Sequence, residues 1–347
     1  MEIGSEFWWD SDLITSSDAV CEKISNNNYI YTESGRGAIN LILENLDDHV
    51  KGVQLPSYIC ESVIQPFLEN NYNIFFYNVN LDLSVDINSI KNMDKTSVFF
   101  HLGYYGFYTN SEIKNIVNKM EKDLILIEDK THTLLSQSDI DNSKYTVASL
   151  RKWLGLPSGG FATGLNIKPV LTTSTIISEL RKKALILKED YIKNDVQNKA
   201  KFLKMFDYAE VELDKCSKSY KIDSDSLNIL KHTNFKNISD TRRENFLTLL
   251  RGLENVLVEP IFSELPDDVV PLFFPIYSKQ RNKLRNHLIN NEIYCPIHWP
   301  KSEMVEGSIS DDVQKIYDEI LSIPIDQRYG ISEMERIIQI VNNWKGD

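Results

Sequence analysis

The chain has 347 residues, a formal net charge of −12 and a hydrophobic content of 42%, values typical of a soluble globular protein. The negative charge disfavours non-specific binding to nucleic acid or to anionic membranes. No apolar run reaches the length of about 20 residues that a membrane helix needs, and the acidic first residues do not match a secretion signal. We therefore expect a cytoplasmic protein without nucleic-acid or membrane partners.

Strand-like and helical patterns alternate through the first half of the chain. The predicted strands are 29–31, 52–55, 74–78, 97–101, 124–127 and 145–148. The predicted helices begin near Ala38, cover 61–70 and occupy part of 109–122. This alternation predicts a mostly parallel sheet with helices on both faces and a ligand site at the carboxyl ends of the strands.

The second half changes character after Thr163. A last strand is predicted over 165–170, and mainly helical blocks are predicted over 174–212 and 224–256. Ser224 or Asp225 is the expected N-cap of one helix and Asp240 that of another. At least one of the adjacent arginines 242 and 243 is expected on a solvated helix face.

The end of the chain again alternates between short strands and helices. Strands are predicted over 269–277 and 293–300, and helices over 280–291 and 332–344, the last preceded by the segment LSIPID. This pattern predicts a small α+β domain. We expect a large domain over 1–240, with an N-terminal arm over 1–28, and a small C-terminal domain over 241–347.

An acid and a lysine follow two of the predicted strands. The apolar run 124–127 ends in Glu128 and Asp129, and the run 145–148 leads into Ser149-Leu150-Arg151-Lys152. Pyridoxal phosphate needs a lysine amine to hold its aldehyde as a Schiff base and a carboxylate to keep its pyridine nitrogen protonated. Lys152 and Asp129 are the candidates for these roles. Taken singly, such an Asp is most often a cap and such a Lys is most often solvated.

A glycine-containing turn provides a candidate phosphate site. Gly35, Arg36 and Gly37 open a predicted helix, where free backbone N–H groups and the helix dipole favour an anion. The alternative is an ordinary capped helix with an exposed arginine. The cysteines (Cys21, Cys60, Cys216 and Cys295) lie far apart, so we expect free thiols and no metal site.

The pyridoxal ring also needs a flat group against its face. Tyr58, His101 and Tyr104 are candidates, because they follow predicted strands in the same layer as Asp129. A histidine at a strand end is more often a hydrogen-bonded structural group, and the tyrosines also suit loop packing. The sequence leaves these alternatives open.

Together these motifs resemble the DegT/DnrJ/EryC1/StrS sugar aminotransferases, which are fold type I pyridoxal-phosphate enzymes. The likeness runs from about Tyr29 to Trp344. SGRGAI is similar to the family's SGTAAL phosphate turn, PSYIC to the segment beside the ring, HLGYYGF to its H-x-x-G loop and IEDKTHTLLS to EDAAHALGA. DTRRENF, PIYSKQRNKLRNHL, IHWP and LSIP resemble its C-terminal half.

The chain departs from the family pattern in three places. The family usually writes its lysine motif as S-F-x-x-x-K, with the lysine five positions after the serine. In this chain Lys152 lies three positions after Ser149, a spacing closer to that of the broader aminotransferase superfamily. Lys130 and Thr131 replace the small residues that normally follow the aspartate. The asparagine-bearing loop that the family often lends to a neighbouring subunit has no clear counterpart.

The resemblance implies a fold, a cofactor and a site. The expected fold is that of a fold type I pyridoxal-phosphate transferase, an α/β protein with a large, mostly parallel sheet and a small C-terminal α+β domain. Asp129 would hold the pyridine nitrogen and Lys152 the aldehyde of pyridoxal 5'-phosphate. The other implied cofactor contacts are Gly35, Arg36, Gly37, Tyr58, His101, His132 and Ser149, and the implied substrate contacts are Tyr104 and His298.

The resemblance also implies an activity, and two alternatives to it remain. The expected reaction moves an amino group, with glutamate as donor, to a keto group on a nucleotide-linked sugar, as in polysaccharide biosynthesis, in a homodimer. One alternative is a dehydratase-like reaction on a sugar, although relatives of that kind commonly carry His at the position of Lys152. The other is a cofactor-binding homologue without turnover, which the Lys130-Thr131 departure favours.

Overall fold

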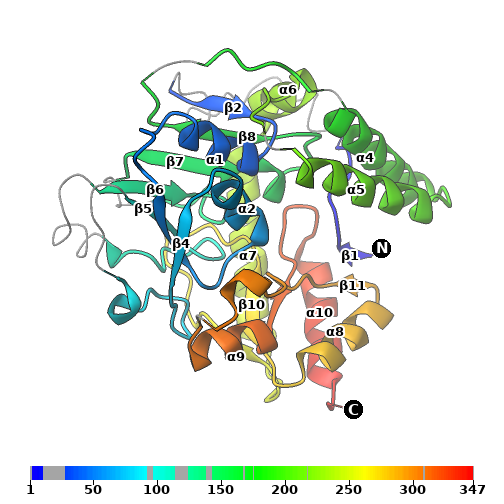
Figure 1. Ribbon diagram of the computed structural model, residues 1–347. Coiled ribbons are helices and arrows are strands. Elements are labelled where there is room, and N and C mark those ends of the chain that lie inside the picture. Colours follow the sequence, from blue (N-terminus) through cyan, green and yellow to red (C-terminus); the bar gives the residue numbers. More distant parts are fainter. Residues whose placement is uncertain are drawn as a thin grey trace.

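A seven-stranded sheet lies at the centre of the structure, a computed structural model (Figure 1). The structure describes residues 2–10, 28–91, 97–113, 124–137, 143–166, 169–174, 176–216, 218–307 and 309–346. The strands of this sheet are β2 (Ile30–Thr32), β3 (Gly52–Pro56), β4 (Asn73–Tyr77), β5 (Ser97–Leu102), β6 (Ile125–Asp129), β7 (Tyr145–Ser149) and β8 (Gly160–Thr163). They follow the order β2-β8-β7-β6-β5-β3-β4.

Strands β3 to β7 pair in parallel, and β8 pairs antiparallel with both β7 and β2. Every residue of β6 is buried, as expected for a central strand covered on both faces. The carboxyl ends of neighbouring parallel strands share one edge of a sheet. The ends of β6 and β7 therefore bring Asp129 and Ser149 to the same edge.

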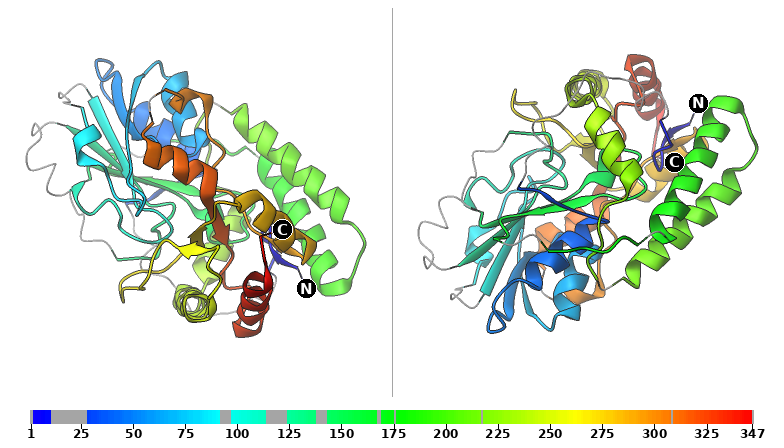
Figure 2. Two further views of the ribbon diagram at one scale, coloured as in Figure 1. Left: turned by 90° about the horizontal axis from the view of Figure 1, so that it is seen from below. Right: turned by 90° about the horizontal axis from the view of Figure 1, so that it is seen from above.

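Helices cover both faces of this sheet (Figure 2). The helices α1 (Gly35–Leu43) and α2 (Glu61–Glu69) lie on one face, and α7 (Phe235–Gly252) lies toward the other. Helix α1 is buried on nearly all sides, because every residue from Ala38 to Leu43 except Asn40 is apolar. Each fully buried isoleucine or leucine there contributes about 1.5–3 kcal/mol to folding.

The last third of the chain forms a second layer of strands and helices. A three-stranded antiparallel sheet has the order β12-β10-β9, and β1 pairs in parallel with β11. These strands are β1 (Ile3–Gly4), β9 (Glu259–Pro260), β10 (Phe274–Tyr277), β11 (Ile293–Tyr294) and β12 (Ile320–Ile323). The accompanying helices are α8 (Arg281–Asn290), α9 (Asp311–Glu319) and α10 (Ile331–Asn343).

Three further α-helices belong to the described part of the chain. The helices α4 (Ile176–Asn194) and α5 (Lys199–Asp214) pack against each other at one side of the body (Figure 2). Helix α6 (Ser224–His232) leads into α7. No helix in the described part of the chain is long and apolar enough to cross a membrane.

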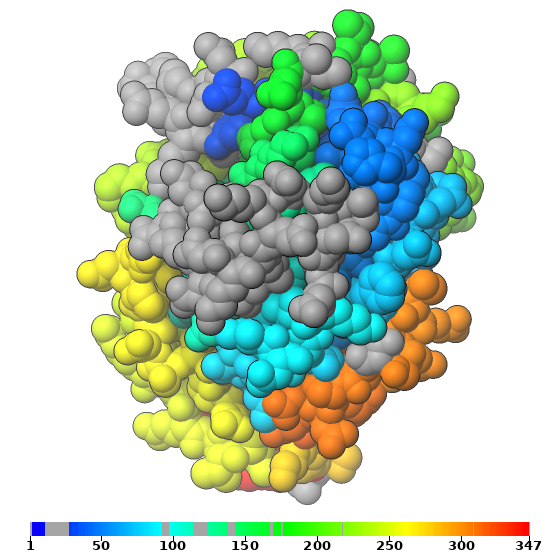
Figure 3. Space-filling model, turned by 60° about the vertical axis from the view of Figure 1, so that its left-hand side comes forward, coloured from blue at the N-terminus to red at the C-terminus, as the bar shows by residue number. Residues whose placement is uncertain are grey.

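The C-terminal elements pack directly against the central sheet. Figure 3 shows the segment from α9 beside the residues that follow β4. The hydroxyl of Tyr317 on α9 donates to the carbonyl oxygen of Ser57 at 2.8 Å, and the hydroxyl of Tyr277 on β10 donates to that of Leu81 at 2.8 Å. These two contacts fix the C-terminal layer over the carboxyl edge of the sheet.

The structure corrects several local predictions. No strand is present in the described part of 165–170; the strand is β8, which precedes it. A side chain at Gly160 would lie 2.3 Å from the backbone of Ser34, so only glycine permits this pairing beside α1. The strand predicted over 293–300 is reduced to β11, because the prolines that follow cannot donate to a ladder.

The helix caps also differ from the prediction. Asp223 caps α6 by accepting a hydrogen bond from the backbone N–H of Ser226, and Asn234 caps α7 in the same way. Asp240 lies inside α7 and pairs with Lys236 one turn earlier. The predicted boundary at residue 240 also falls within α7, and the two-domain division stays a prediction. Residues 11–27 of the arm and 114–122 of a predicted helix lie outside the described residues.

Candidate functional site

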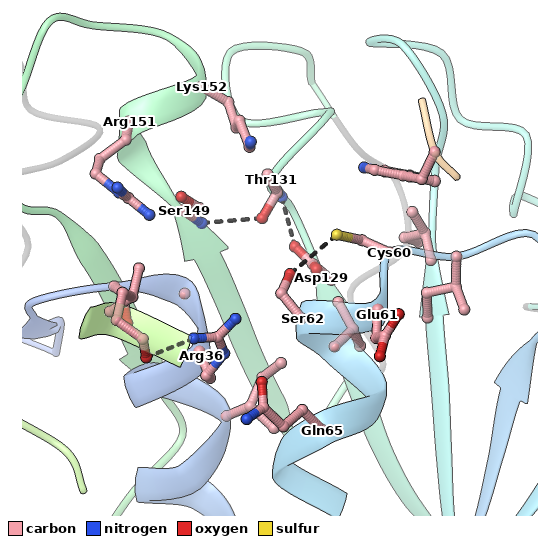
Figure 4. Close-up of a pocket in the computed structure, with 18 of the residues that line it drawn as sticks. Arg36, Cys60, Glu61, Ser62, Gln65, Asp129, Thr131, Ser149, Arg151 and Lys152 are labelled. Atoms are coloured by element: carbon pink, nitrogen blue, oxygen red, sulfur yellow. Dashed lines mark hydrogen bonds between the residues drawn. The ribbon is translucent and has the colours of Figure 1, made fainter. Parts of the chain in front are cut away.

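Two cavities meet at Lys152. The first, which we call the Asp129 cavity, has a volume of about 680 Å³ and lies between the end of β6 and the first turns of α1 and α2 (Figure 4). The second, which we call the arginine cavity, has a volume of about 860 Å³. Arg151, Lys152 and Glu210 line both cavities.

Asp129 presents a buried carboxylate to the first cavity. It is 6% exposed, and its Oδ1 accepts a hydrogen bond of 2.7 Å from the backbone N–H of Thr131. Burial raises the pKa of Asp129 to about 6, although the hydrogen bonds from Thr131 lower it. Within the described residues this carboxylate has no ion pair, so a cationic N–H from a ligand would satisfy it.

Thr131 connects Asp129 to the strand that precedes the lysine. Its hydroxyl accepts from the backbone N–H of Ser149 at 2.9 Å, and its carbonyl oxygen accepts from the Trp153 indole N–H at 2.7 Å. Figure 4 shows Thr131 between Asp129 and Ser149, with Lys152 pointing toward it. Thr131 therefore braces the ends of β6 and β7, a role that its motif did not reveal in the sequence.

The first turn of α1 faces the same cavity. Ser34 caps the helix by accepting from the N–H of Gly37 at 3.0 Å, which leaves the N–H groups of Gly35 and Arg36 without helical acceptors. A side chain at Gly35 would lie 3.1 Å from the Cβ of Ser149. Gly35, Arg36 and Ser149 line the cavity, whereas Gly37 does not.

The guanidinium of Arg36 has protein partners of its own. It donates to the carbonyl oxygen of Leu213 at 2.6 Å and to the carboxylate of Asp214 at 2.8 Å. These bonds tie the start of α1 to the end of α5. Asp214 is largely exposed, so its pairing with Arg36 is open to competition from solvent or from an anion.

Lys152 ends the short 3-10 helix η3 (Leu150–Lys152), directly after β7. It forms no hydrogen bond or ion pair with any described residue, and its side chain points into the Asp129 cavity (Figure 4). The neighbouring Arg151 and the distant Arg181 both donate to Glu210, at 2.8 Å and 2.5 Å. Although burial opposes it, these two charges lower the pKa of Glu210 to about 2.

Two aromatic rings line the Asp129 cavity, those of His132 and Trp299. Their centroids are 5.1 Å apart, and the rings are tilted by 31°. Burial, together with the charge of Lys152, lowers the pKa of His132 to about 3. Nδ1 of His132 accepts from the backbone N–H of Tyr105 at 3.2 Å, so this neutral ring carries its proton on Nε2.

His298 lines the arginine cavity. Its Nδ1 lies 2.8 Å from the hydroxyl of Ser322, which itself donates to the hydroxyl of Tyr105 at 3.3 Å. The tautomer of His298 decides which atom of this pair donates: when Nδ1 carries the proton, it donates to Ser322, and Nε2 is then an acceptor. Burial holds the pKa of His298 well below its usual value, and electrostatic repulsion from His132 and Lys152 lowers this pKa further.

Three of the sequence candidates lie behind the cavity walls. Tyr58 and Tyr104 are almost completely buried, and the hydroxyl of Tyr104 donates to the carbonyl oxygen of Tyr58 at 2.5 Å. His101 is fully buried between Ser143 and Asn110, at 3.1 Å and 2.9 Å. Neither cavity is lined by these three side chains, because each is used for packing and internal hydrogen bonds.

Several cavity residues were not identified from the sequence. Cys60 lies opposite Asp129 in Figure 4, with its sulfur 3.0 Å from the hydroxyl of Ser62. Trp299 could have been found from the sequence, because it belongs to the IHWP motif. Glu210 lies within α5 and belongs to no motif, so the sequence did not indicate it. The described residues contain no group of three or more His, Cys, Asp or Glu side chains arranged to hold a metal ion.

Comparison with known proteins gives a match at the level of structure only. No protein-family model matches the chain, and no curated protein sequence matches it significantly. Many solved structures do match. Spr1654 from Streptococcus pneumoniae in its PMP form has a TM-score of 0.70 at 11% identity, covering 99% of this chain and 97% of that one.

Two further solved structures have a similar fold. The sugar aminotransferase CalS13 from Micromonospora echinospora has a TM-score of 0.63 at 14% identity, covering 93% of this chain and 89% of its own. DesV from S. venezuelae, solved in complex with a ketimine intermediate, has a TM-score of 0.65 at 15% identity, with coverages of 93% and 86%. The mainly parallel sheet with flanking helices is therefore the fold of these aminotransferase structures.

Proposed function

We propose that this chain is a pyridoxal-phosphate-dependent aminotransferase that acts on a keto sugar, with glutamate as amino donor and a nucleotide-linked sugar as acceptor. The observation that carries the proposal is the placement of Asp129 and Lys152 in one cavity. Asp129 is a buried carboxylate without an ion pair, and Lys152 is an amine without a partner among the described residues. A cytoplasmic location suits these reactants.

The residues of the Asp129 cavity fit this cofactor. The carboxylate of Asp129 would hold the proton on the ring nitrogen, and the amine of Lys152 would hold the aldehyde carbon. The N–H groups of Gly35 and Arg36, with the hydroxyl of Ser149, would bind the phosphate at the positive end of α1. His132 and Trp299 offer flat faces that replace Tyr58, Tyr104 and His101 in this proposal.

The cofactor, when bound, supplies the electron sink for cleavage of a bond at the amino-bearing carbon. The amine of Lys152 would move the proton at that carbon as general base and then as general acid. Thr131 would keep Asp129 and the Lys152 turn in register through its three hydrogen bonds. Neutral His298 would orient a sugar hydroxyl in the arginine cavity through a hydrogen bond.

The absorbance of the cofactor-loaded protein tests this function. Glutamate alone should convert the visible band of the bound cofactor to that of its aminated form, and a keto-sugar nucleotide should restore it. A homologue without turnover would show no change with glutamate. A dehydratase-like enzyme would change with the sugar substrate but would not release 2-oxoglutarate from glutamate. Either result would exclude the aminotransferase proposal.

A further inference from the structure

The arginine cavity has an unusual charge for this protein. Lys152 and five arginines line it, namely Arg151, Arg181, Arg242, Arg285 and Arg328, against three carboxylates, those of Glu6, Glu210 and Asp326. The lining therefore carries three more positive than negative groups, whereas the whole chain has a net charge of −12. A cavity with this excess suits an anionic ligand.

The three carboxylates already form ion pairs with three of the arginines. Glu210 accepts from Arg151 and Arg181, and Glu6 lies 3.4 Å from Arg181. Asp326 binds Arg328 through both of its oxygens, at 2.6 Å and 2.9 Å. Arg242 and Arg285 are left without a carboxylate partner in the described part of the chain.

Arg242 is a buried cation without an ion pair. It is 1% exposed; its Nε donates to Gln327 at 3.0 Å and its Nη1 donates to the carbonyl oxygen of Leu272 at 2.7 Å. Its remaining amino group, Nη2, has no partner among the described residues. Burial lowers the pKa of Arg242 to about 10, so it is still charged at neutral pH. The nearby carboxylate of Asp326 compensates this charge only in part, because Asp326 forms its ion pair with Arg328. A buried charge that is incompletely paired is costly, which points to an anion supplied by a ligand.

Arg242 is also linked to the turn that carries Lys152. Its guanidinium lies 4.7 Å from the ring centre of Trp153, the residue after Lys152. The amide of Gln327 accepts from Arg242 and donates to the carbonyl oxygen of Trp153 at 2.8 Å. An anion held by Arg242 would therefore lie in the same cavity as the lysine amine, at a position fixed relative to it.

Arg285 offers the second free guanidinium. It lies on α8, is half-buried, and its Nε donates to the carbonyl oxygen of Cys295 at 3.1 Å. This bond orients the side chain, and its two Nη groups have no partner among the described residues. A guanidinium binds a carboxylate or a phosphate through paired hydrogen bonds, which a lysine cannot reproduce.

We propose that Arg242 and Arg285 form an oxyanion receptor in the arginine cavity, which holds a carboxylate or phosphate group of the substrate while its reacting carbon faces Lys152. The inference rests on the proposed function for the position of the reacting carbon. The oxyanion has two sources, the carboxylate of the amino donor and the phosphate of a nucleotide-linked sugar. Both have the same chemistry, and separate probes distinguish them.

Calorimetric titration of the cofactor-loaded protein tests the receptor. The probes are glutarate, a dicarboxylate without an amino group, and inorganic pyrophosphate; neither can react, so binding does not depend on turnover. Arg285→Gln should weaken binding of at least one probe by about tenfold or more. Arg242→Lys keeps the charge but loses the paired donors, and should weaken the same probe. The visible band of the cofactor shows that the probes have not displaced it.

Arg251→Gln is the matched control, since Arg251 is exposed at the end of α7 and lines neither cavity. Loss of glutarate binding alone supports a receptor for the donor carboxylate, and loss of pyrophosphate binding alone supports a receptor for the acceptor phosphate. Equal binding by wild type and both variants, or no binding by wild type, would overturn the proposal. Arginine-dependent binding without aminotransferase activity would keep the receptor and reject only the proposed function.

Discussion

Replacing Asp129 with asparagine separates cofactor binding from catalysis. Asp129→Asn keeps the shape of the side chain, and its amide oxygen can still accept the hydrogen bond that Thr131 donates at 2.7 Å. It removes the negative charge that would pair with the ring nitrogen. A charge-assisted hydrogen bond of this kind contributes about 1.5–3 kcal/mol. We expect a modest loss of cofactor affinity and a loss in rate of at least about 100-fold, at about 1.4 kcal/mol per factor of ten.

The rate should suffer more than the affinity for a physical reason. Negative charge flows toward the ring in the transition state, so the ring proton matters more there than in the ground state. The assay is the single-turnover reaction with glutamate at saturating cofactor. Asp86→Asn is a matched control, because the Asp86 carboxylate also accepts from a backbone N–H two residues later, at 3.0 Å, outside both cavities. Near-equal rates for wild type and Asp129→Asn would refute the assignment.

Asp129→Asn should also stabilise the folded state of the cofactor-free protein at neutral pH. Burial raises the pKa of Asp129 from 3.8 to about 6, a shift that corresponds to about 3 kcal/mol. Because the folded pKa is raised, ionisation destabilises the fold progressively as pH increases from about 4 through 6. Asp129→Asn should therefore raise the free energy of unfolding at pH 7.5 and leave it nearly unchanged at pH 4. No gain at pH 7.5 would contradict the buried, unpaired carboxylate.

Three other outcomes are expected. Thr131→Val should lower the free energy of unfolding by about 1 kcal/mol, since the N–H of Ser149 loses its acceptor, and Thr131→Ser should restore it; denaturant titration measures both. Cofactor affinity in wild type should fall as pH decreases through about 6, because Asp129 becomes protonated there. Fluorescence titration measures this affinity, and a constant value across this pH range would contradict the prediction. The protein should sediment as a homodimer at micromolar concentration, because Leu203, Tyr208 and Val211 are exposed on α5; a monomer would contradict this.

The sheet and the edge at which Asp129 and Ser149 meet were predictable because both depend on local pattern. Apolar runs of strand length alternate with helical spacing, and this alternation predicts parallel strands whose carboxyl ends meet. Asp129 and Ser149 follow two such runs, and the structure places them at the ends of neighbouring strands. The local pattern alone therefore predicts that Asp129 and Lys152 belong to one candidate site.

The remaining walls of the site come from segments far away in the sequence. Glu210 on α5 and Arg242 on α7 look like ordinary polar positions of amphipathic helices, and only tertiary packing brings them to Lys152. The side chains of Tyr58 and His101 do not line the two cavities, for a related reason. Their hydrogen-bond partners lie in other segments, and these partners turn both side chains into the interior.

Reduction of the loaded protein with sodium borohydride tests the central claim most directly. The purified protein should be yellow with bound pyridoxal phosphate, and the reductant should bleach the visible band and fix the cofactor to one lysine. Peptide mapping should place that lysine at Lys152, and Lys152→Ala should bind some cofactor without forming the link. A link mapped to another lysine, such as Lys130, or no link in wild type, would contradict the account.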